Sequence, residues 1–325
     1  MSLRYLTAGE SHGPALVAIV EGLPAGLKLE ERLLDEQLQR RQSGYGAGPR
    51  MKLERDHAQI LSGVMAGQTT GAPLAILIEN LDHAKWRGKQ VEAFTTPRPG
   101  HVDLAGAIKY GYEDIRPGLE RASARETAVR VAVGAVCRQL LAVFGIKVGG
   151  YVVSIGEIDS SLDAMPFEER FARAEASEVR CPDPAAAEAM QDRIRAVMQE
   201  RDTLGGVIEI VALGLPAGLG SHVHWDRRLE AKLGAAVLSV QAIKGVEFGP
   251  AFANTRLPGT KVHDALRLDG SRLVGPTWKG MAGSTHELVD GSSVTVDEAY
   301  LIQSILEPNA AVVKGFPPGV MPATY

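Results

Sequence analysis

The stretch "TAVRVAVGAVCRQLLAVF" (residues 127–144) decides the fold, because its apolar side chains surround most of a predicted helix. The helix is expected over residues 123–144, and Gly145 ends it. A helix that is apolar on most sides has to be covered on most sides by other elements. Candidate strands lie before and after it, without strict strand and helix alternation, at residues 58–62, 73–79 and 148–158. The sequence therefore predicts an α+β fold, a β-α-β sandwich with helices packed between antiparallel sheets.

One segment occurs twice in related form. "VAIVEGLPAGL" (residues 17–27) and "IEIVALGLPAGL" (residues 208–219) each read as a strand closed by a Pro-Gly turn. A polar helix with spaced leucines is expected after each, at residues 30–41 and 226–240. The pattern indicates a duplicated strand-turn-helix unit, or one good turn sequence that is used twice. Between the two copies, the polar and Ala-rich residues 166–199 predict a solvated helical insertion.

The composition describes a globular protein with no overall positive field. The 325 residues are 45% hydrophobic, and 35 Lys and Arg against 39 Asp and Glu give a formal net charge of -4. That balance argues against a nucleic-acid partner, so any bound anion must be met by local groups. Apolar stretches such as "PLAILIE" (residues 73–79) are too short to span a bilayer, and the N-terminus lacks a signal-peptide pattern. We therefore expect a cytoplasmic protein with no nucleic-acid or membrane partner.

The two cysteines predict neither a disulfide nor a metal site. Cys137 lies within the apolar helix and Cys181 is far from it in the sequence, so they form no framework of paired cysteines and no Cys-rich ligand set. Both are expected to be reduced and structural.

Two histidines stand in turns that suit proton transfer. "TAGESHGPA" (residues 7–15) places His12 beside Ser11, and "TTPRPGHVD" (residues 95–103) presents His101 after a rigid Pro-Gly turn. Imidazole exchanges a proton near neutral pH, and two of them can serve two stages of one reaction. A single histidine near the end of a strand is more often structural, so the pair is what favours catalysis.

A glycine-rich basic loop follows the first predicted helix. "RRQSGYGAGPRMKLER" (residues 40–55) holds five Lys and Arg side chains, among them Arg41 and Arg50. Guanidinium groups match carboxylate and phosphate oxygens in pairs, so the loop predicts a small, multiply anionic ligand. It does not fit the G-x-G-x-x-G pattern of a dinucleotide fold. A solvated charged loop is the other interpretation.

The long helix begins with "ERASARET" (residues 120–127). Ser123 and Glu126 have the spacing of a capping box, which alone explains Ser123. The same helix start carries free amides and a partial positive charge between Arg121 and Arg125, which suits a phosphate.

These segments, in this order, closely resemble chorismate synthase over residues 1–269. The resemblance rests on "AGESHG", on the basic loop, on "RPGHVDLAGAIKYGYEDIRPGLERASARETAVRVAVGAV", on "DTLGGVIEIVALGLPAGLGSHVHWDRRL" and on "QAIKGVEFG". It implies elimination of phosphate from 5-enolpyruvylshikimate 3-phosphate to give chorismate, with reduced FMN as cofactor. It also implies a homotetramer of β-α-β sandwich subunits. Whether NADPH or an external reductase supplies the reduced flavin stays open.

The resemblance also implies roles for individual residues. His12 and His101 match the two acid-base histidines of the family, one of which assists loss of phosphate and the other protonates the reduced flavin. Ser11 matches an active-site serine. The positions that match flavin contacts are Arg121, Ala122, Ser123, Gln241 and Ala242. Arg41 matches an arginine of the anion-binding loop, and Ala47 stands where the next such arginine is expected, with Arg50 assigned to take its place. Arg125 is assigned to anion binding from its position at the helix start.

After about residue 270 the sequence departs from the family pattern. The expected Asn-Arg-Ala-Gly-Gly flavin loop and a later catalytic aspartate are missing. Residues 271–325 resemble instead the distal half of a cytochrome c domain of cytochrome oxidase subunit II. They lack the C-x-x-C-H that anchors haem, so no haem is expected. The chain is thus interpreted as a chimera of a chorismate synthase-like domain (residues 1–270) and a foreign tail, with impaired activity. The alternative is a catalytically inactive scaffold that binds anions or assembles with intact subunits.

Overall fold

The computed structural model describes residues 3–46, 54–162 and 165–263, together with the backbone of four short strands beyond them. These strands form two antiparallel pairs, β10 (Arg267–Asp269) with β11 (Arg272–Val274) and β12 (Thr285–Glu287) with β13 (Ser293–Thr295). The chain divides into two compact units, Met1–Leu215 with Leu238–Ile243 and Pro216–Val237 with Lys244–Tyr325. Residue 270 lies outside the described residues, so the boundary expected there stays a prediction.

The first unit opens with a four-stranded antiparallel sheet in the order β1-β2-β6-β3. Its strands are β1 (Arg4–Ala8), β2 (Ala15–Glu21), β6 (Leu74–Glu79) and β3 (Gln59–Ser62), and a small hairpin of β4 (Val64–Met65) and β5 (Gln68–Thr69) follows β3. Alternate side chains of β2 and β6 are almost completely buried, namely Leu16, Ala18, Val20, Leu74, Ile76 and Ile78. This period of two turns one face of the sheet toward the helices.

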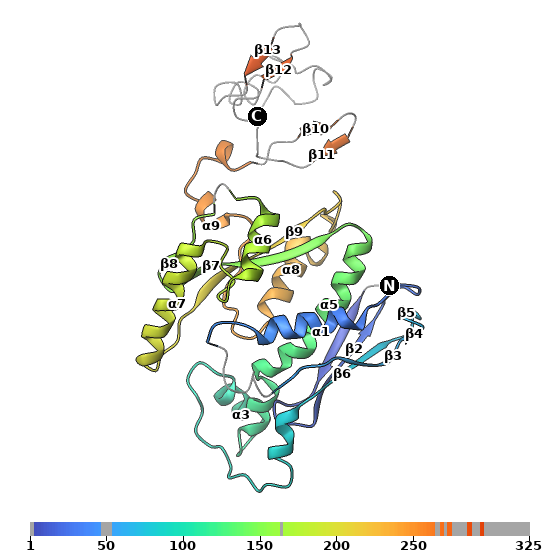
Figure 1. Cartoon of the computed structure of the whole chain (residues 1–325), viewed down its shortest axis with the longest axis vertical. Coiled ribbons are helices and arrows are strands. Elements are labelled where there is room, and N and C mark those ends of the chain that lie inside the picture. Colours follow the sequence, from blue (N-terminus) through green and yellow to red (C-terminus); the bar gives the residue numbers. More distant parts are fainter. Residues whose placement is uncertain are drawn as a thin grey trace. The chain divides into compact units, whose positions relative to one another are not determined.

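Two helices cover that face (Figure 1). They are α1 (Glu31–Gln42) and α5 (Thr127–Val143), which pack against one another and form one core with the sheet. The longest predicted helix is therefore confirmed, with its first turn formed by a separate 3-10 segment, η2 (Ala124–Glu126). The other face of α5 meets the first strand of a second sheet.

The second sheet has three antiparallel strands in the order β8-β7-β9. They are β7 (Lys147–Ile155), β8 (Ile158–Asp159) and β9 (Gly206–Leu213). The predicted α+β class, with helices between antiparallel sheets, is confirmed.

The segment expected to be a solvated insertion is helical but not solvated on all sides. It forms α6 (Phe167–Ala176) and α7 (Pro184–Gln199), and each helix buries one face. Phe171 of α6 lies directly over Gly149 of β7, where an added Cβ would come within 2.6 Å of the ring. The expectation failed because the few large apolar residues are spaced to lie together on one helix face, which average composition does not reveal.

The two copies of the repeated segment form similar elements. The first gives β2 and α1, and the second gives β9 and then α8 (Leu229–Leu238), after a 3-10 turn η3 (Trp225–Arg227). The remaining short helices are η1 (Leu81–Lys85), α3 (Asp103–Tyr110), α4 (Arg116–Arg121), α9 (Ala251–Asn254) and η4 (Gly259–Lys261). Cys137 and Cys181 are free thiols. Of the helices in the described part of the chain, none has both the length and the apolar character of a membrane span.

Candidate active site

The loop between β1 and β2 carries Ser11 and His12, and a glycine makes its shape possible. Gly9 has φ 113°, and a Cβ at this position would lie 2.5 Å from the carbonyl oxygen of Ala15. An L side chain is therefore excluded both by conformation and by space. The loop can then turn back into β2 and present residues 10–13 toward α4 and η1.

His12 is held on several sides. Its Nδ1 lies 2.7 Å from Glu120 Oε1, and its backbone N–H donates to Glu120 Oε2 at 2.7 Å. Its Nε2 lies 3.9 Å from Asp82 Oδ2, and its ring packs against Trp86 with 4.8 Å between ring centroids. His83 Nδ1 contacts the His12 carbonyl oxygen at 2.8 Å. A ring restrained in this way is suited to proton transfer in a fixed direction.

Ser11 links this loop to the start of α5. It is only 3% exposed, its backbone N–H donates to the Glu120 carbonyl at 3.1 Å, and Ser123 Oγ lies 3.1 Å from its Oγ. Ser123 also accepts from the backbone N–H of Arg125, so the predicted N-terminal cap is confirmed. The two serines and His12 therefore lie in one connected group.

Arg125 is the central cation of this region and is 6% exposed. Its guanidinium donates to Asp56 Oδ1 at 2.6 Å, to Asn80 Oδ1 at 2.8 Å and to the Glu79 carbonyl at 3.3 Å. Glu54 Oε2 lies 3.6 Å away. Asn80 in turn donates through its Nδ2 to two carbonyl oxygens of the histidine loop, those of Glu10 and Gly13. The buried charge thus holds the loop in place.

Arg41 reaches the same acidic group from α1. Its Nη1 lies 3.5 Å from Asp56 Oδ2, its Nε donates to Thr127 Oγ1 at 3.0 Å, and its Nη2 donates to the Ala124 carbonyl at 3.1 Å. Arg50 lies outside the described residues. The contacts described here for Arg41 and Arg125 are to protein groups, and binding of a ligand anion by these arginines stays a prediction.

Gln241, one of the residues expected to contact flavin, meets a buried carboxylate. Glu126 is 2% exposed and accepts from Thr7 Oγ1 at 2.6 Å, Gln241 Nε2 at 2.9 Å and Arg130 Nε at 2.9 Å. Burial raises its pKa, but hydrogen bonds from these three donors outweigh burial and lower it. Arg121 donates to the carbonyl and the hydroxyl of Thr7, both at 3.0 Å. The carboxylate of Glu126 accepts from Thr7, Gln241 and Arg130, so it does not complete the predicted capping box with Ser123.

Two further features mark the segment after α8. Gln241 Oε1 is a buried acceptor that has no hydrogen-bond partner among the described residues. The next residue, Ala242, has φ 69°, a conformation rare for residues other than glycine. Ala122 and Ala242 are both exposed.

His101 has a simpler setting than His12. It is exposed, and its Nδ1 lies 2.9 Å from the carbonyl of Pro99 on its own loop. The loop is fastened by Asp103, whose carboxylate accepts from Arg98 Nε at 2.8 Å, Nη2 at 3.0 Å and the Arg98 backbone N–H at 3.0 Å. Side-chain hydrogen bonds from Arg98, acting against burial, lower the pKa of Asp103 to about 2. No described contact joins His101 directly to His12.

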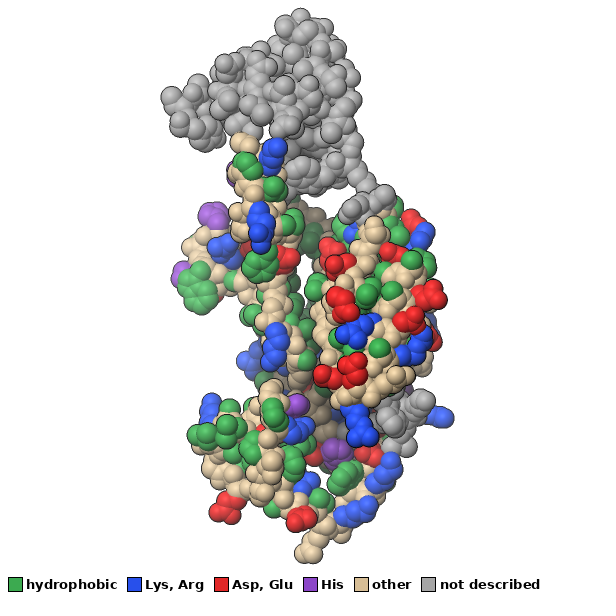
Figure 2. Space-filling model, turned by 90° about the vertical axis from the view of Figure 1, so that its left-hand side faces the viewer, with side chains coloured by type: hydrophobic (Ala, Val, Ile, Leu, Met, Phe, Trp, Pro, Cys, Tyr) green, Lys and Arg blue, Asp and Glu red, His purple; other side chains and the backbone are tan. Residues whose placement is uncertain are grey.

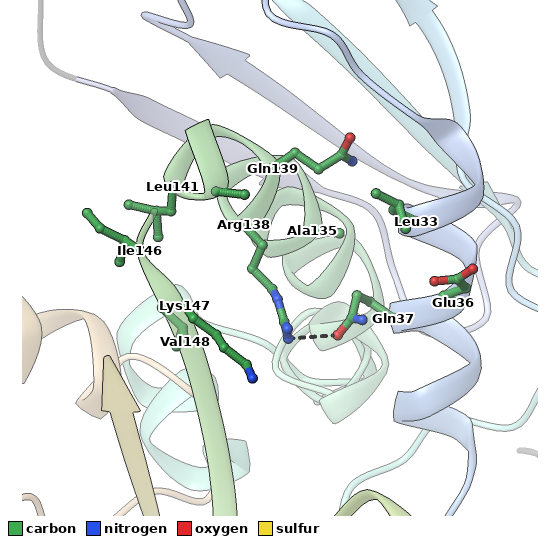
Figure 3. Close-up of a pocket in the computed structure, with 11 residues that line it drawn as sticks. Leu33, Glu36, Gln37, Ala135, Arg138, Gln139, Leu141, Ile146, Lys147 and Val148 are labelled. Atoms are coloured by element: carbon green, nitrogen blue, oxygen red, sulfur yellow. Dashed lines mark hydrogen bonds between the residues drawn. The ribbon is translucent and has the colours of Figure 1, made fainter. Parts of the chain in front are cut away.

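The structure thus brings together most of the predicted site residues within the first unit. Figure 2 shows histidine, basic and acidic side chains gathered in the lower part of one face. A groove of about 360 Å³ lies elsewhere, between α1, α5 and the start of β7, and Figure 3 shows Arg138 and Lys147 beside it. None of the predicted site residues lines this groove, so it does not mark the site.

The residues that bond to the predicted site residues were not predicted from the sequence. They are Thr7, Glu54, Asp56, Asn80, Asp82 and Glu120. Glu120 and Thr7 stand inside stretches that were singled out, but nothing in their spacing shows that they meet. Asp56 and Asn80 are both buried polar residues, which would mark them as members of the site, but their burial is known only from the fold.

Comparison with known proteins gives one consistent result. A family model described as "Chorismate synthase" matches residues 3–296. A chorismate synthase from Trichlorobacter lovleyi is 54% identical over 280 residues, which is 83% of this chain and 71% of the relative. One from Geobacter metallireducens is 46% identical over 323 residues, or 96% of this chain and 82% of the relative.

A solved structure titled "Crystal Structure of Chorismate Synthase" aligns with a TM-score of 0.73 and 41% identity, covering 91% of this chain and 82% of that one. The family match continues past residue 269, so the resemblance extends farther than expected from the sequence. These comparisons give no support to a cytochrome c-like tail.

Replacement of Arg125 by Met should destabilise the first unit by about 3–5 kcal/mol, because the buried carboxylates of Asp56 and Glu54 would both lose this guanidinium. Arg41 would remain 3.5 Å from Asp56. The free energy of unfolding, measured by urea denaturation, checks this. Arg173→Met is the matched control, since Arg173 pairs with Glu169 at the surface and the pair is worth about 1 kcal/mol or less. Equal losses in the two variants would contradict a central role for Arg125.

Asp103 should make stability depend on acid pH. A carboxyl whose folded pKa is lowered to about 2 stabilises the fold fully above its unfolded pKa of about 3.9, and this contribution is lost as the pH falls toward 2. Asp103→Asn should therefore be less stable than the parent at pH 7. The difference between their free energies of unfolding should become smaller between about pH 4 and 2. Urea denaturation across this range measures it, with the exposed Asp192→Asn as control. A gap that stays constant would contradict the assignment.

Proposed function

Because the chain belongs to the chorismate synthase family, we propose that it converts 5-enolpyruvylshikimate 3-phosphate to chorismate by trans-1,4 elimination of phosphate. One C–O bond to phosphate and one C–H bond break, and the reaction is neutral in oxidation state overall. The observation that carries the proposal is the group formed by His12, Ser11 and Ser123 at the start of α5. Acting as an acid-base residue, His12 would lie beside a helix start that favours an anion.

His12 is proposed to supply the proton that phosphate takes on departure. Negative charge develops on the leaving oxygen, and a positioned imidazolium can neutralise it. Arg41 and Arg50 are proposed to hold the anionic groups of the substrate, since guanidinium groups pair with phosphate and carboxylate oxygens. Ser11 lies beside His12 and orders the same loop.

The setting of Gln241 supports the proposal that the residues expected at the flavin bind it. The buried Gln241 Oε1 is an acceptor without a described partner, and an isoalloxazine ring offers an N–H donor. Arg121, Ala122, Ser123 and Ala242 would contact the ring beside it. Reduced FMN, when bound, supplies electron density for breaking an unactivated C–H bond, which protein side chains are poorly suited to do.

His101 is proposed as the second acid-base residue. Its exposed ring lies on a loop that Asp103 and Arg98 fix, so its proton can exchange with solvent and with a bound cofactor.

We further propose, from family membership, that the protein is a cytoplasmic homotetramer.

The direct test mixes the purified chain with substrate and chemically reduced FMN under anaerobic conditions. Phosphate and chorismate should appear in equal amounts. His101→Ala should lower kcat by at least about 10²-fold, the usual contribution of a general acid, while His263→Ala, an exposed histidine, should leave it unchanged.

Two other outcomes have separate meanings. If neither a flavin spectral change nor phosphate release occurs, the proposed activity is wrong for this chain. Saturable binding of substrate without turnover would identify the inactive scaffold. Replacing the chemical reductant by NADPH shows whether the chain reduces its own flavin.

Gln241→Leu should weaken the binding of reduced FMN about 2- to 12-fold. This corresponds to the loss of one net hydrogen bond of about 0.5–1.5 kcal/mol. Anaerobic titration followed by flavin absorbance measures the Kd. Gln199→Leu, an exposed position at the end of α7, is the control. Unchanged affinity in Gln241→Leu would place the flavin elsewhere.

A further inference from the structure

Glu120 contacts the histidine loop at three points. Its carboxylate oxygens meet His12 Nδ1 and the His12 backbone N–H, each at 2.7 Å, and its carbonyl accepts from the Ser11 N–H at 3.1 Å. We propose that Glu120 is a positioning residue that fixes the tautomer and direction of the His12 ring, so that Nε2 exchanges the proton with the substrate. This rests on the proposed function of His12.

The chemistry of a carboxylate sets the tautomer. An ionised carboxylate only accepts hydrogen bonds, so both atoms that meet it must donate. Neutral imidazole has one N–H, and the contact with Glu120 places it on Nδ1. The lone pair of neutral His12 is then on Nε2, and in the protonated ring Nε2–H is the bond that can be given up.

The rest of the ring's surroundings support the same direction. Trp86 packs against the ring, and its Nε1 donates to Asp82 Oδ2 at 3.3 Å. Asp82 is also paired with Lys85 Nζ at 2.9 Å, and its Oδ2 lies 3.9 Å from His12 Nε2, longer than a hydrogen bond. The short contact to a carboxylate is thus on Nδ1.

Glu120 is itself well restrained. Its side chain is 12% exposed, and it belongs to the last turn of α4, which is tied to the chain before it by the Leu119 N–H and Ile115 carbonyl. A partner fixed on a helix costs less side-chain entropy on contact than one on a free loop. The position of Nε2 is therefore set before substrate binds.

The first test needs no substitution at Glu120. Protein labelled with 15N at histidine, compared with His12→Asn to assign the signal, reports which ring nitrogen carries the proton when His12 is neutral. We expect the proton on Nδ1. A neutral His12 with its proton on Nε2 would overturn the proposal.

The second test is Glu120→Gln. Glu120 meets Nδ1 and the backbone N–H with two different oxygens, and in glutamine one of these is replaced by an NH₂ donor, so only one of the two contacts keeps its acceptor. The 15N spectrum should show an increased share of the Nε2–H tautomer. The kcat should fall about 10²- to 10⁴-fold, as expected when an acid-base residue is wrongly presented, with KM changed much less.

Glu113→Gln is the matched control, because Glu113 is an exposed carboxylate seven residues earlier in the chain. It should leave both tautomer and kcat unchanged. A Glu120→Gln protein that folds, keeps the Nδ1–H tautomer and retains kcat would overturn the proposal. If the parent chain shows no turnover, the proposed function fails, while the spectra still decide the tautomer.

Discussion

The buried guanidinium of Arg125 is the interaction on which the site depends. It lies just before α5, where it meets the end of β6 and residues 54–56, and its acceptors come from these two segments. A buried cation of this kind is tolerated only when its donors are matched, and here Asp56 and Glu54 supply the opposite charge. Through Asn80 the same charge fixes the loop that carries His12. The position of the proposed catalytic loop and local stability therefore depend on one network.

The sandwich explains why this network lies at the start of α5. The helix is apolar over most of its circumference, so its length is covered by α1 and by both sheets. The side chains that α5 buries are all apolar, and a polar network lies at its N-terminal end, where the loop from β1 to β2 and the end of α4 also arrive. The partial positive charge of that end adds to the exposed Arg121, whereas the charge of Arg125 is matched by Asp56 and Glu54. The packing of the core therefore places this polar network at the end of the helix where we propose that an anion binds.

Features that depend on a local sequence pattern, such as helices, strands and a helix cap, could be predicted from the sequence. Contacts between residues that are far apart in the sequence could not. Apolar periodicity gave α5, β2 and β6, and the Ser123 cap was read from its spacing. Glu126 was expected to close the capping box, but Thr7 and Gln241, both distant in sequence, hold it. Glu120 went unnoticed because its partner His12 is 108 residues away. Composition also hid the buried faces of α6 and α7, since a few apolar residues at helical spacing suffice to make a face.

The two histidines differ in a way that fits two separate tasks. His12 is enclosed by Glu120, Trp86 and the backbone of its own loop, so its ring has one direction and one exchanging nitrogen. Such an arrangement favours proton delivery to a leaving group whose position is fixed, since misplacement by about 1 Å is costly there. His101 has a carbonyl of its own loop as partner and an exposed ring, which suits repeated exchange with solvent. An elimination that needs one proton delivered and another returned benefits from residues of both kinds, because a single enclosed histidine would have to recover its proton through the site that the substrate occupies.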